Sequence, residues 1–126
     1  MSWLPGRFAV CRLDAPPSAP FVLSTGLFSV TRTPGEVSVV CREESMPPGA
    51  RCETGWSAMR LSGPIPFEET GVLASLAGPL ARAGISMFAV STYDTDYVLV
   101  RAADAAAAQR ELEAAGFTFR PPPEGE

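Results

Sequence analysis

The sequence predicts an α+β protein made of two ferredoxin-like units in tandem, of which the first is degenerate. The second half reads strand, helix, strand, strand, helix, strand, which is the order of the split βαβ motif. The first half repeats the strands but has a proline-rich stretch where the first helix would be. With 126 residues, 46% hydrophobic and 19% charged, the chain has the composition of a folded protein. We therefore expect antiparallel sheets with helices on one face.

The expected domains are a degenerate N-terminal unit at 1–60 and a complete βαββαβ unit at 55–120. The tail 121–126, "PPPEGE", is too rich in proline and glycine to pack and is expected to be disordered. A unit of about 60 residues buries only about 60% of its unfolded surface, so neither half has a large core of its own. Joined sheets or a dimer would supply the missing burial.

In the first half, "RFAVCRL" at 7–13 predicts a strand, and the "DAPPSAP" that follows cannot be a helix interior. Next, "LFSVTR" and "EVSVVC" flank "TPGE", which predicts a β-hairpin. Pro34 presets the first corner of its turn, and we expect Gly35 to take the positive φ of the second. A further strand is expected from about 55 to 61.

The second half begins with a helix in "GVLASLAGPLARAG", where leucines recur at helical spacing. Thr70 can cap its start, Gly84 lies at its expected C-terminal stop, and Pro79 should kink or shorten it. The segments "ISMFAVSTY" and "DYVLV" then predict two strands joined at Asp94 and Thr95. Asp94 is expected to be the turn residue, because aspartate tolerates turn conformations and bonds the backbone locally.

The last elements are a helix in "ADAAAAQRELEAAG" and a short final strand in "FTF". Asp104 is the expected N-cap of this helix, and Gly116 is the expected stop.

Composition excludes several classes of function. All ten basic residues are arginine, the acidic residues number 14, and the net charge is -4, so a nucleic-acid partner is not expected. The chain has no histidine, no CxxC pair among its three cysteines and no phosphate-binding glycine motif, so we expect no metal, no cofactor and no catalytic residue. The cysteines, at 11, 41 and 52, are expected to be reduced and largely buried. No apolar run approaches the roughly 18 residues of a membrane span and no signal peptide is visible, so we expect a cytoplasmic protein.

The segment "GPIPFEETGVLASLAGPLARAGISMFAVSTYDTDYVLV", at 63–100, resembles the ACT-like domains of a bacterial group of small tandem-ACT proteins and of the CASTOR-type arginine sensors of animal cells. "FSVTRTPGEVSVVC" followed by "GWSAMRLSG" resembles the degenerate leading unit of that bacterial group. ACT domains are regulatory modules that bind amino acids and assemble through their sheets. The resemblance implies a ligand held between two ACT units. Because only the second half is complete, it also implies a homodimer with two sites.

At "EETGV", the helix start presents unpaired N–H groups at Gly71, Val72 and Leu73 that can receive the carboxylate of an amino acid. Glu69 and Asp96 are the natural partners of an ammonium or a cationic side chain, which favours arginine or lysine as the ligand. Glu69 is equally suited to a structural role, in which its negative charge stabilises the positive N-terminal end of the helix dipole. The resemblance places Asp96 at the carboxylate position of the sensors.

Four more residues complete the predicted site. Ser62 and Gly63 reach the same edge if the preceding strand ends near residue 62. Thr92 and Tyr93 line the pocket if the resemblance holds, and are otherwise ordinary strand residues.

We therefore expect a non-catalytic sensor whose occupancy is recognised by an unidentified protein partner. The alternative is a ligand-free interaction module that dimerises or joins a partner through a sheet edge. An enzyme with Glu69 and Asp96 as its carboxylate pair is disfavoured, because histidine, lysine and a phosphate loop are all absent.

Overall fold

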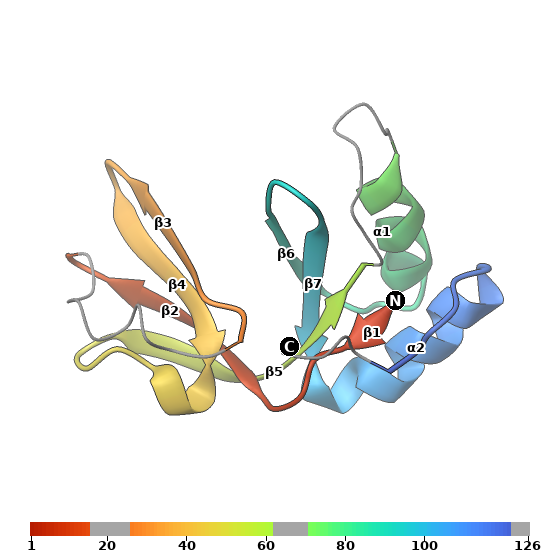
Figure 1. The fold of residues 1–126 in the computed structure, drawn as a ribbon, viewed down its shortest axis with the longest axis horizontal. Helices are drawn as coiled ribbons and strands as arrows, with labels where there is room; N and C mark the ends of the chain where they lie inside the picture. The colour runs from red at the N-terminus through yellow and green to blue at the C-terminus, as the bar shows by residue number, and fades with distance from the viewer. Residues whose placement is uncertain (16–25, 62–70, 122–126) are drawn as a thin grey trace. The chain divides into compact units, whose positions relative to one another are not determined.

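The computed structural model describes residues 1–15, 26–61 and 71–121, and these divide into two units (Figure 1). We call residues 5–56 the N-terminal unit, and residues 1–4 together with 57–121 the C-terminal unit. Both are built from antiparallel strands, and the two α-helices belong to the C-terminal unit, so the predicted α+β class is confirmed. The division falls within the long strand β5 (Arg51–Arg60), which contributes residues to both units.

The N-terminal unit contains β2 (Phe8–Leu13), β3 (Ser29–Thr33) and β4 (Glu36–Arg42), followed by the 3-10 helix η2 (Glu43–Ser45) and the first residues of β5. Its strands lie in the order β3, β4, β2, β5, with every neighbouring pair antiparallel. The predicted hairpin is therefore present as β3 and β4. Buried side chains on one face of this sheet form a small core of Ala9, Cys11, Val39 and Cys41.

The turn of the β3–β4 hairpin is closed by a threonine hydroxyl. The Oγ1 of Thr33 accepts hydrogen bonds from the N–H groups of Gly35, at 3.3 Å, and Glu36, at 3.2 Å. Gly35 does not have the positive φ that we expected of it. With both N–H groups satisfied by Thr33, the turn does not need a left-handed residue at this position.

Two of the three cysteines are joined, which corrects the expectation of three reduced thiols. Cys11 of β2 and Cys52 of β5 are antiparallel partners and form a disulfide. Cys41 is free and buried, as expected. The spacing of cysteines along the chain does not reveal such a pair, because it depends on which strands become neighbours.

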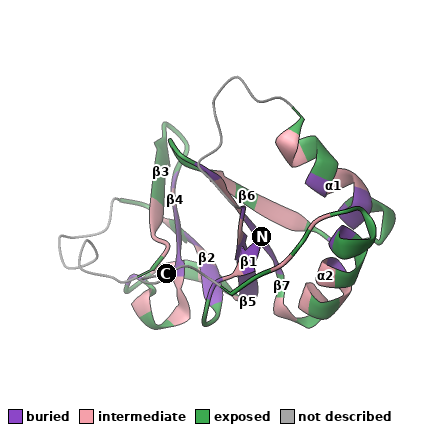
Figure 2. Cartoon of the chain, turned by 45° about the vertical axis from the view of Figure 1, so that its right-hand side comes forward, coloured by how far each residue is buried: buried purple, intermediate pink, exposed green. Residues whose placement is uncertain are grey.

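The C-terminal unit contains β1 (Ser2–Trp3), the end of β5, α1 (Val72–Arg82), β6 (Met87–Ser91), β7 (Asp96–Arg101), the 3-10 helix η3 (Ala102–Asp104) and α2 (Ala105–Ala114). The strands β5, β7 and β6 follow one another across its sheet, and β1 also pairs with β5. Figure 2 shows that buried residues in both helices alternate with exposed ones, as expected of helices that cover a sheet.

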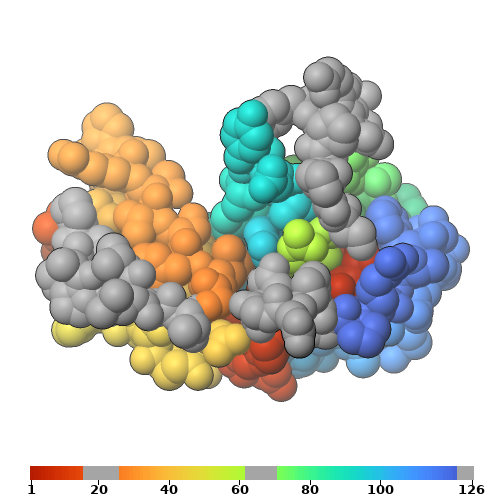
Figure 3. All heavy atoms as spheres, in the orientation of Figure 1, coloured from red at the N-terminus to blue at the C-terminus, as the bar shows by residue number. Residues whose placement is uncertain are grey.

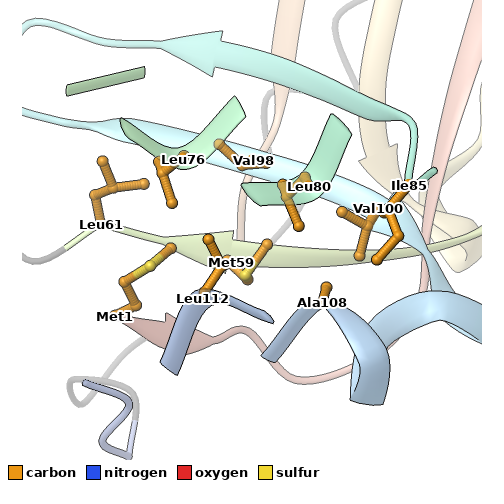
Figure 4. Packing of buried hydrophobic residues seen from close by; sticks show 10 residues of the cluster. All are labelled: Met1, Met59, Leu61, Leu76, Leu80, Ile85, Val98, Val100, Ala108 and Leu112. Carbon is orange, nitrogen blue, oxygen red and sulfur yellow. The ribbon is translucent and has the colours of Figure 1, made fainter. Parts of the chain in front are cut away.

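One core joins both helices to one face of this sheet (Figure 4). Val98 and Val100 of β7 are two residues apart and so point to the same side of their strand, and Met59 of β5 and Leu61 just after it join the same core. Both helices contribute to this core, so they cover the same face, as predicted. Its buried members are Met1, Met59, Leu61, Leu76, Leu80, Ile85, Val98, Val100, Ala108 and Leu112.

Helix α1 ends where the sequence predicts. Gly84 has a φ of 73°, and the N–H of Ile85 donates to the carbonyl of Leu80 at 2.9 Å. Pro79 is buried inside the helix, which continues to Arg82 before it stops. Thr70, the predicted cap, lies outside the described residues.

Helix α2 confirms its predicted stop but not its predicted cap. Past Gly116, the N–H of Phe117 donates to the carbonyl of Leu112 at 3.0 Å. The side chain of Asp104 makes no capping hydrogen bond. The reason is that η3 leads directly into α2, so the backbone at Asp104 is already near-helical, with φ -98° and ψ 0°.

The predicted strand at 117–119 is not formed. These residues instead run beside the first residues of the chain, where the N–H of Arg120 donates to the carbonyl of Met1 at 2.8 Å. The ring of Trp3 stacks on Phe119 with 5.9 Å between centroids, and its indole N–H donates to Gln109 at 2.8 Å. Strand β1, rather than 117–119, pairs with β5.

Candidate functional site

The predicted site includes the turn between β6 and β7, which the space-filling view of Figure 3 shows on the molecular surface (cyan). The N–H of Thr92 donates to the carbonyl of Thr95 at 2.8 Å, and the Oγ1 of Thr92 accepts from the N–H of Thr95 at 3.2 Å. Tyr93 and Asp94 occupy the two central positions, and Tyr93 is 80% exposed. Asp94 is thus in the turn, but the local hydrogen bonds come from Thr92.

Asp96 begins β7 directly opposite Ser91 of β6. The hydroxyl of Ser91 donates a hydrogen bond to Oδ1 of Asp96, and the backbone carbonyl of Asp96 accepts from the N–H of Leu61 at 3.0 Å. Asp96 is half-buried as a residue, and no ion pair involves its carboxylate among the residues that the structure describes. A carboxylate held in one orientation without a counter-charge is suited to receive a cation.

Thr95 ties the turn to the end of β5. Its side chain is 5% exposed, and its hydroxyl donates to the carbonyl of Leu61 at 3.0 Å. Ser91, Thr95 and Leu61 were not predicted to belong to the site. The repeated threonine of "TYDT" was the available signal for Thr95, whereas Ser91 could be identified only from the register of the two strands.

Helix α1 supplies the second chemical feature. Gly71 lies at its N-cap position with a φ of 78°, a conformation that L side chains rarely adopt, although a Cβ would meet nothing within 4 Å. Gly71 has no side chain with which to cap the helix, and the first turn contains no acidic residue. Val72 is half-buried against the core. The described residues thus provide no side-chain acceptor for the first N–H groups of α1, which can receive an anion.

These two features lie at the same end of the C-terminal unit (Figure 1). Figure 4 shows why: Leu61, Leu76 and Val98 pack together at one end of the core. Leu76 is one turn after Val72, and Val98 is two residues after Asp96. The same core contact therefore brings the start of α1 and the start of β7 to one region.

Three predicted residues, Ser62, Gly63 and Glu69, lie outside the described residues. The predicted pairing of Glu69 with Asp96 therefore remains a prediction. Thr92 and Tyr93 lie in the turn itself, not in a strand.

No cluster of three or more potential metal-ligating side chains occurs within residues 1–15, 26–61 and 71–121. In the same ranges, no helix combines the length and the hydropathy needed to cross a membrane.

Comparison with known proteins gives two matches to family models. A model described as an ACT domain matches residues 51–114, about half of the chain. A second model, described as an N-terminal domain, matches residues 6–49.

Among curated proteins, the human cytosolic arginine sensor for mTORC1 subunit 1 is 34% identical over 95 residues, covering 69% of this chain and 29% of the relative. The Bos taurus protein of the same name is 46% identical over 46 residues, covering 36% and 14%. This chain therefore spans less than a third of the length of these relatives.

Among solved structures, a structural-genomics protein from Agrobacterium tumefaciens has a TM-score of 0.86 and 33% identity, covering 99% of this chain and 94% of that one. A protein of unknown function from Vibrio cholerae, described as a possible transport protein, has a TM-score of 0.73 and 22% identity, with coverage of 91% and 88%. The regulatory subunit of aspartate kinase from Thermus thermophilus has a TM-score of 0.62 and 14% identity, with coverage of 89% and 94%. The last two similarities concern the fold alone.

Proposed function

Because the chain belongs to the ACT domain family, we propose that it is a non-catalytic, cytoplasmic regulatory protein that binds an amino acid at the region formed by the start of α1 and the β6–β7 hairpin. The observation that carries this proposal is the carboxylate of Asp96, held by Ser91 without a described counter-charge, inside the segment that matches the ACT model. The nearby N-terminus of α1 carries a partial positive charge, opposite in sign to the carboxylate of Asp96.

The two features complement a zwitterion. The first N–H groups of α1 receive the α-carboxylate, and Gly71 allows its close approach. Asp96, together with Glu69 from outside the described residues, receives the positive groups of the ligand. Ser62, Gly63, Thr92 and Tyr93 complete the proposed contacts.

The ligand class that we propose is a cationic amino acid, with arginine ahead of lysine. A zwitterion needs one carboxylate for its ammonium, so a second one at Glu69 would meet a cationic side chain. The human relative, which is 34% identical over 95 residues, is named as an arginine sensor, which supports arginine. We do not assign the partner of the human relative to this chain. We propose that an unidentified protein partner recognises the ligand-bound state.

We further propose that the site is completed by a second copy of the chain. The ACT model matches one segment, 51–114, so a site between two such units requires a homodimer with two equivalent ligands. Sedimentation with and without ligand, combined with titration calorimetry, tests this arrangement. A monomer that binds one ligand would contradict it.

The first prediction is that arginine raises the melting temperature of the protein and that Asp96→Ala removes the effect. A ligand at about 100 times its dissociation constant stabilises the folded state by about 2.7 kcal/mol, which corresponds to several degrees. A thermal-shift screen against the twenty amino acids provides the measurement.

Asp94→Ala is the matched control for this screen, because it removes a carboxylate two residues away in the turn. It should keep the full shift. The proposed site is misplaced if an amino acid stabilises the parent and Asp96→Ala equally. The sensor function fails if no amino acid moves the midpoint of the parent protein.

One observation favours the alternative of an interaction module. Among the described strands, β6 pairs with β7 alone, which leaves its other edge available for strand addition. A protein that forms dimers while no amino acid changes its melting temperature would support this alternative.

A further inference from the structure

The N-terminal unit places two cysteines directly opposite each other on neighbouring strands. Cys11 of β2 and Cys52 of β5 are antiparallel partners whose Cα atoms are 4.0 Å apart, and their sulfurs are bonded. Residues directly opposite each other in an antiparallel pair have their side chains on the same face of the sheet. The two sulfurs therefore remain neighbours whether or not the bond is closed.

The sheet does not depend on this bond for its register. Strand β2 pairs with β4 along its whole length, from Phe8 opposite Arg42 to Leu13 opposite Val37. Cys11 also packs in the small core with Ala9, Val39 and Cys41, which reduction does not remove. We expect the strands to keep their places when the sulfurs are reduced.

The two sulfurs differ in their access to solvent. Cys11 is only 2% exposed, whereas Cys52 is half-buried and lies at the margin of the same core. Thiol–disulfide exchange requires a reagent to reach the sulfur that it attacks. External reagents should therefore react at Cys52, and Cys11 should react only with its neighbour.

We propose that Cys11 and Cys52 form a reversible redox site that exchanges with a low-molecular-weight disulfide of the glutathione class. In oxidation, the Cys52 thiolate attacks one sulfur of glutathione disulfide, the S–S bond breaks, and one glutathione leaves as a thiolate that takes up a proton. The Cys11 thiolate then attacks the sulfur of Cys52 and displaces the second glutathione. Two electrons pass from the protein to the reagent, and two glutathione molecules are released.

Reduction follows the reverse path. A glutathione thiolate attacks the accessible sulfur of Cys52 and releases Cys11, and a second glutathione then frees Cys52 as glutathione disulfide forms.

The third cysteine stays out of this exchange. Cys41 is fully buried in β4, where its direct partner on β2 is Ala9 and not Cys11. Burial, and then the charge of Glu44, raises the pKa of the Cys41 thiol to about 11, so it stays protonated near neutral pH and is not a nucleophile. The chain thus contains its own unreactive reference thiol.

The second prediction is that the Cys11–Cys52 bond opens and closes with the glutathione ratio. It is tested by equilibrating the folded protein in a series of reduced and oxidised glutathione mixtures. The samples are quenched with acid, unfolded and labelled with a maleimide, and mass spectrometry counts the free thiols. We expect three free thiols at the reducing end and one, at Cys41, at the oxidising end. Because the bond closes a sequence separation of 41 residues, the oxidised protein should melt roughly 10 °C higher than the reduced one.

Single variants test the order of the steps. Cys11→Ser should accumulate a stable glutathione adduct on Cys52, because the resolving thiol is gone. Cys52→Ser should leave Cys11 unmodified in the folded state, and Cys41→Ser should titrate like the parent. The parent titration remains decisive if a variant fails to fold.

Three outcomes would overturn the proposal. The first is three free thiols at every glutathione ratio. The second is a bond that stays closed in the folded protein at the most reducing ratio, which would make it a permanent cross-link. The third is a disulfide that contains Cys41.

Discussion

Asp94 and Asp96 show how position around one turn separates two identical side chains. Asp94 occupies a central position of the turn, and its neighbours supply the hydrogen bonds that close it. Asp96 begins the returning strand, where Ser91 lies opposite and binds its carboxylate. Of the two, Asp96 is the one whose carboxylate is held by a hydrogen bond from the facing strand.

The third prediction concerns the thiol of Cys41 as a single residue. Its pKa is raised from 9.0 to about 11, so at pH 8 its thiolate fraction, and hence its alkylation rate, should be about 100-fold below that of the unfolded chain. The measurement is the rate of reaction with iodoacetamide against pH. The double variant Cys11→Ser with Cys52→Ser leaves Cys41 as the sole thiol, and the same variant in urea is the reference.

The raised pKa of Cys41 also makes the free energy of unfolding depend on pH. The unfolded chain loses this proton near pH 9, while the folded protein keeps it to about pH 11, so the stabilisation is present below pH 9 and is lost as pH rises to 11. A folded-state rate within threefold of the urea reference at pH 8 would show that the thiol is not protected.

At this scale, the sequence distinguishes Asp94 from Asp96 because aspartate is common in turns and unfavourable in strands. It does not reveal Ser91 as a partner of Asp96, since that pairing depends on the strand register. It also does not reveal the Cys11–Cys52 bond, because the strands that carry these residues are separated by the whole β3–β4 hairpin.

Two elements, the β3–β4 and β6–β7 hairpins, are closed by the same device. In each, a threonine precedes two central residues, and its hydroxyl accepts the N–H of the residue three positions later: Thr33 from Glu36, and Thr92 from Thr95. One hairpin is in each unit. That the first half is a degenerate copy of the second stays a prediction.

The fourth prediction is that Thr92→Val destabilises the protein by about 1 kcal/mol, because valine keeps the shape of threonine but removes the hydroxyl that satisfies the turn. Chemical denaturation measures the change, and Thr33→Val is the matched variant in the other hairpin. A Thr92→Val protein as stable as the parent would show that the hydroxyl is dispensable.

Other elements show where local rules succeed. Gly84 and Gly116 mark both helix ends, because a left-handed residue after the last turn is a property of a few consecutive residues. Asp104 does not cap α2, because the 3-10 helix η3 leads directly into α2. The sequence patterns did not indicate η3.

For the whole molecule, alternating apolar residues and helical spacing were sufficient to predict an α+β protein with antiparallel sheets. The place of β1 was not predictable, because Ser2 pairs with Arg60 and the apolar "FTF" looked like the better strand. The sequence predicted Asp96, Gly71 and Val72 as site residues, and the common core brings the elements that carry them to one end of the C-terminal unit. Their role in binding a ligand stays a prediction.

The fifth prediction tests that core. Leu112→Ala removes a fully buried side chain of α2 and should cost about 2–5 kcal/mol of unfolding free energy. Glu111→Ala, an exposed neighbour on the same helix, should change it by less than about 0.5 kcal/mol. Chemical denaturation of both variants is the measurement, and equal effects would show that this core does not determine stability.

The division inside β5 limits how such a protein can be recombined. A gene fragment that starts at residue 51, where the ACT match begins, would encode α1, β6, β7 and α2 but would lack β1. It would therefore lose the strand that pairs with Met59 and Arg60, the buried side chain of Met1 and the ring that stacks on Phe119. The two matched segments are separable in an alignment, but they are not interchangeable modules, because residues 1–4 belong to the same unit as residues 57–121.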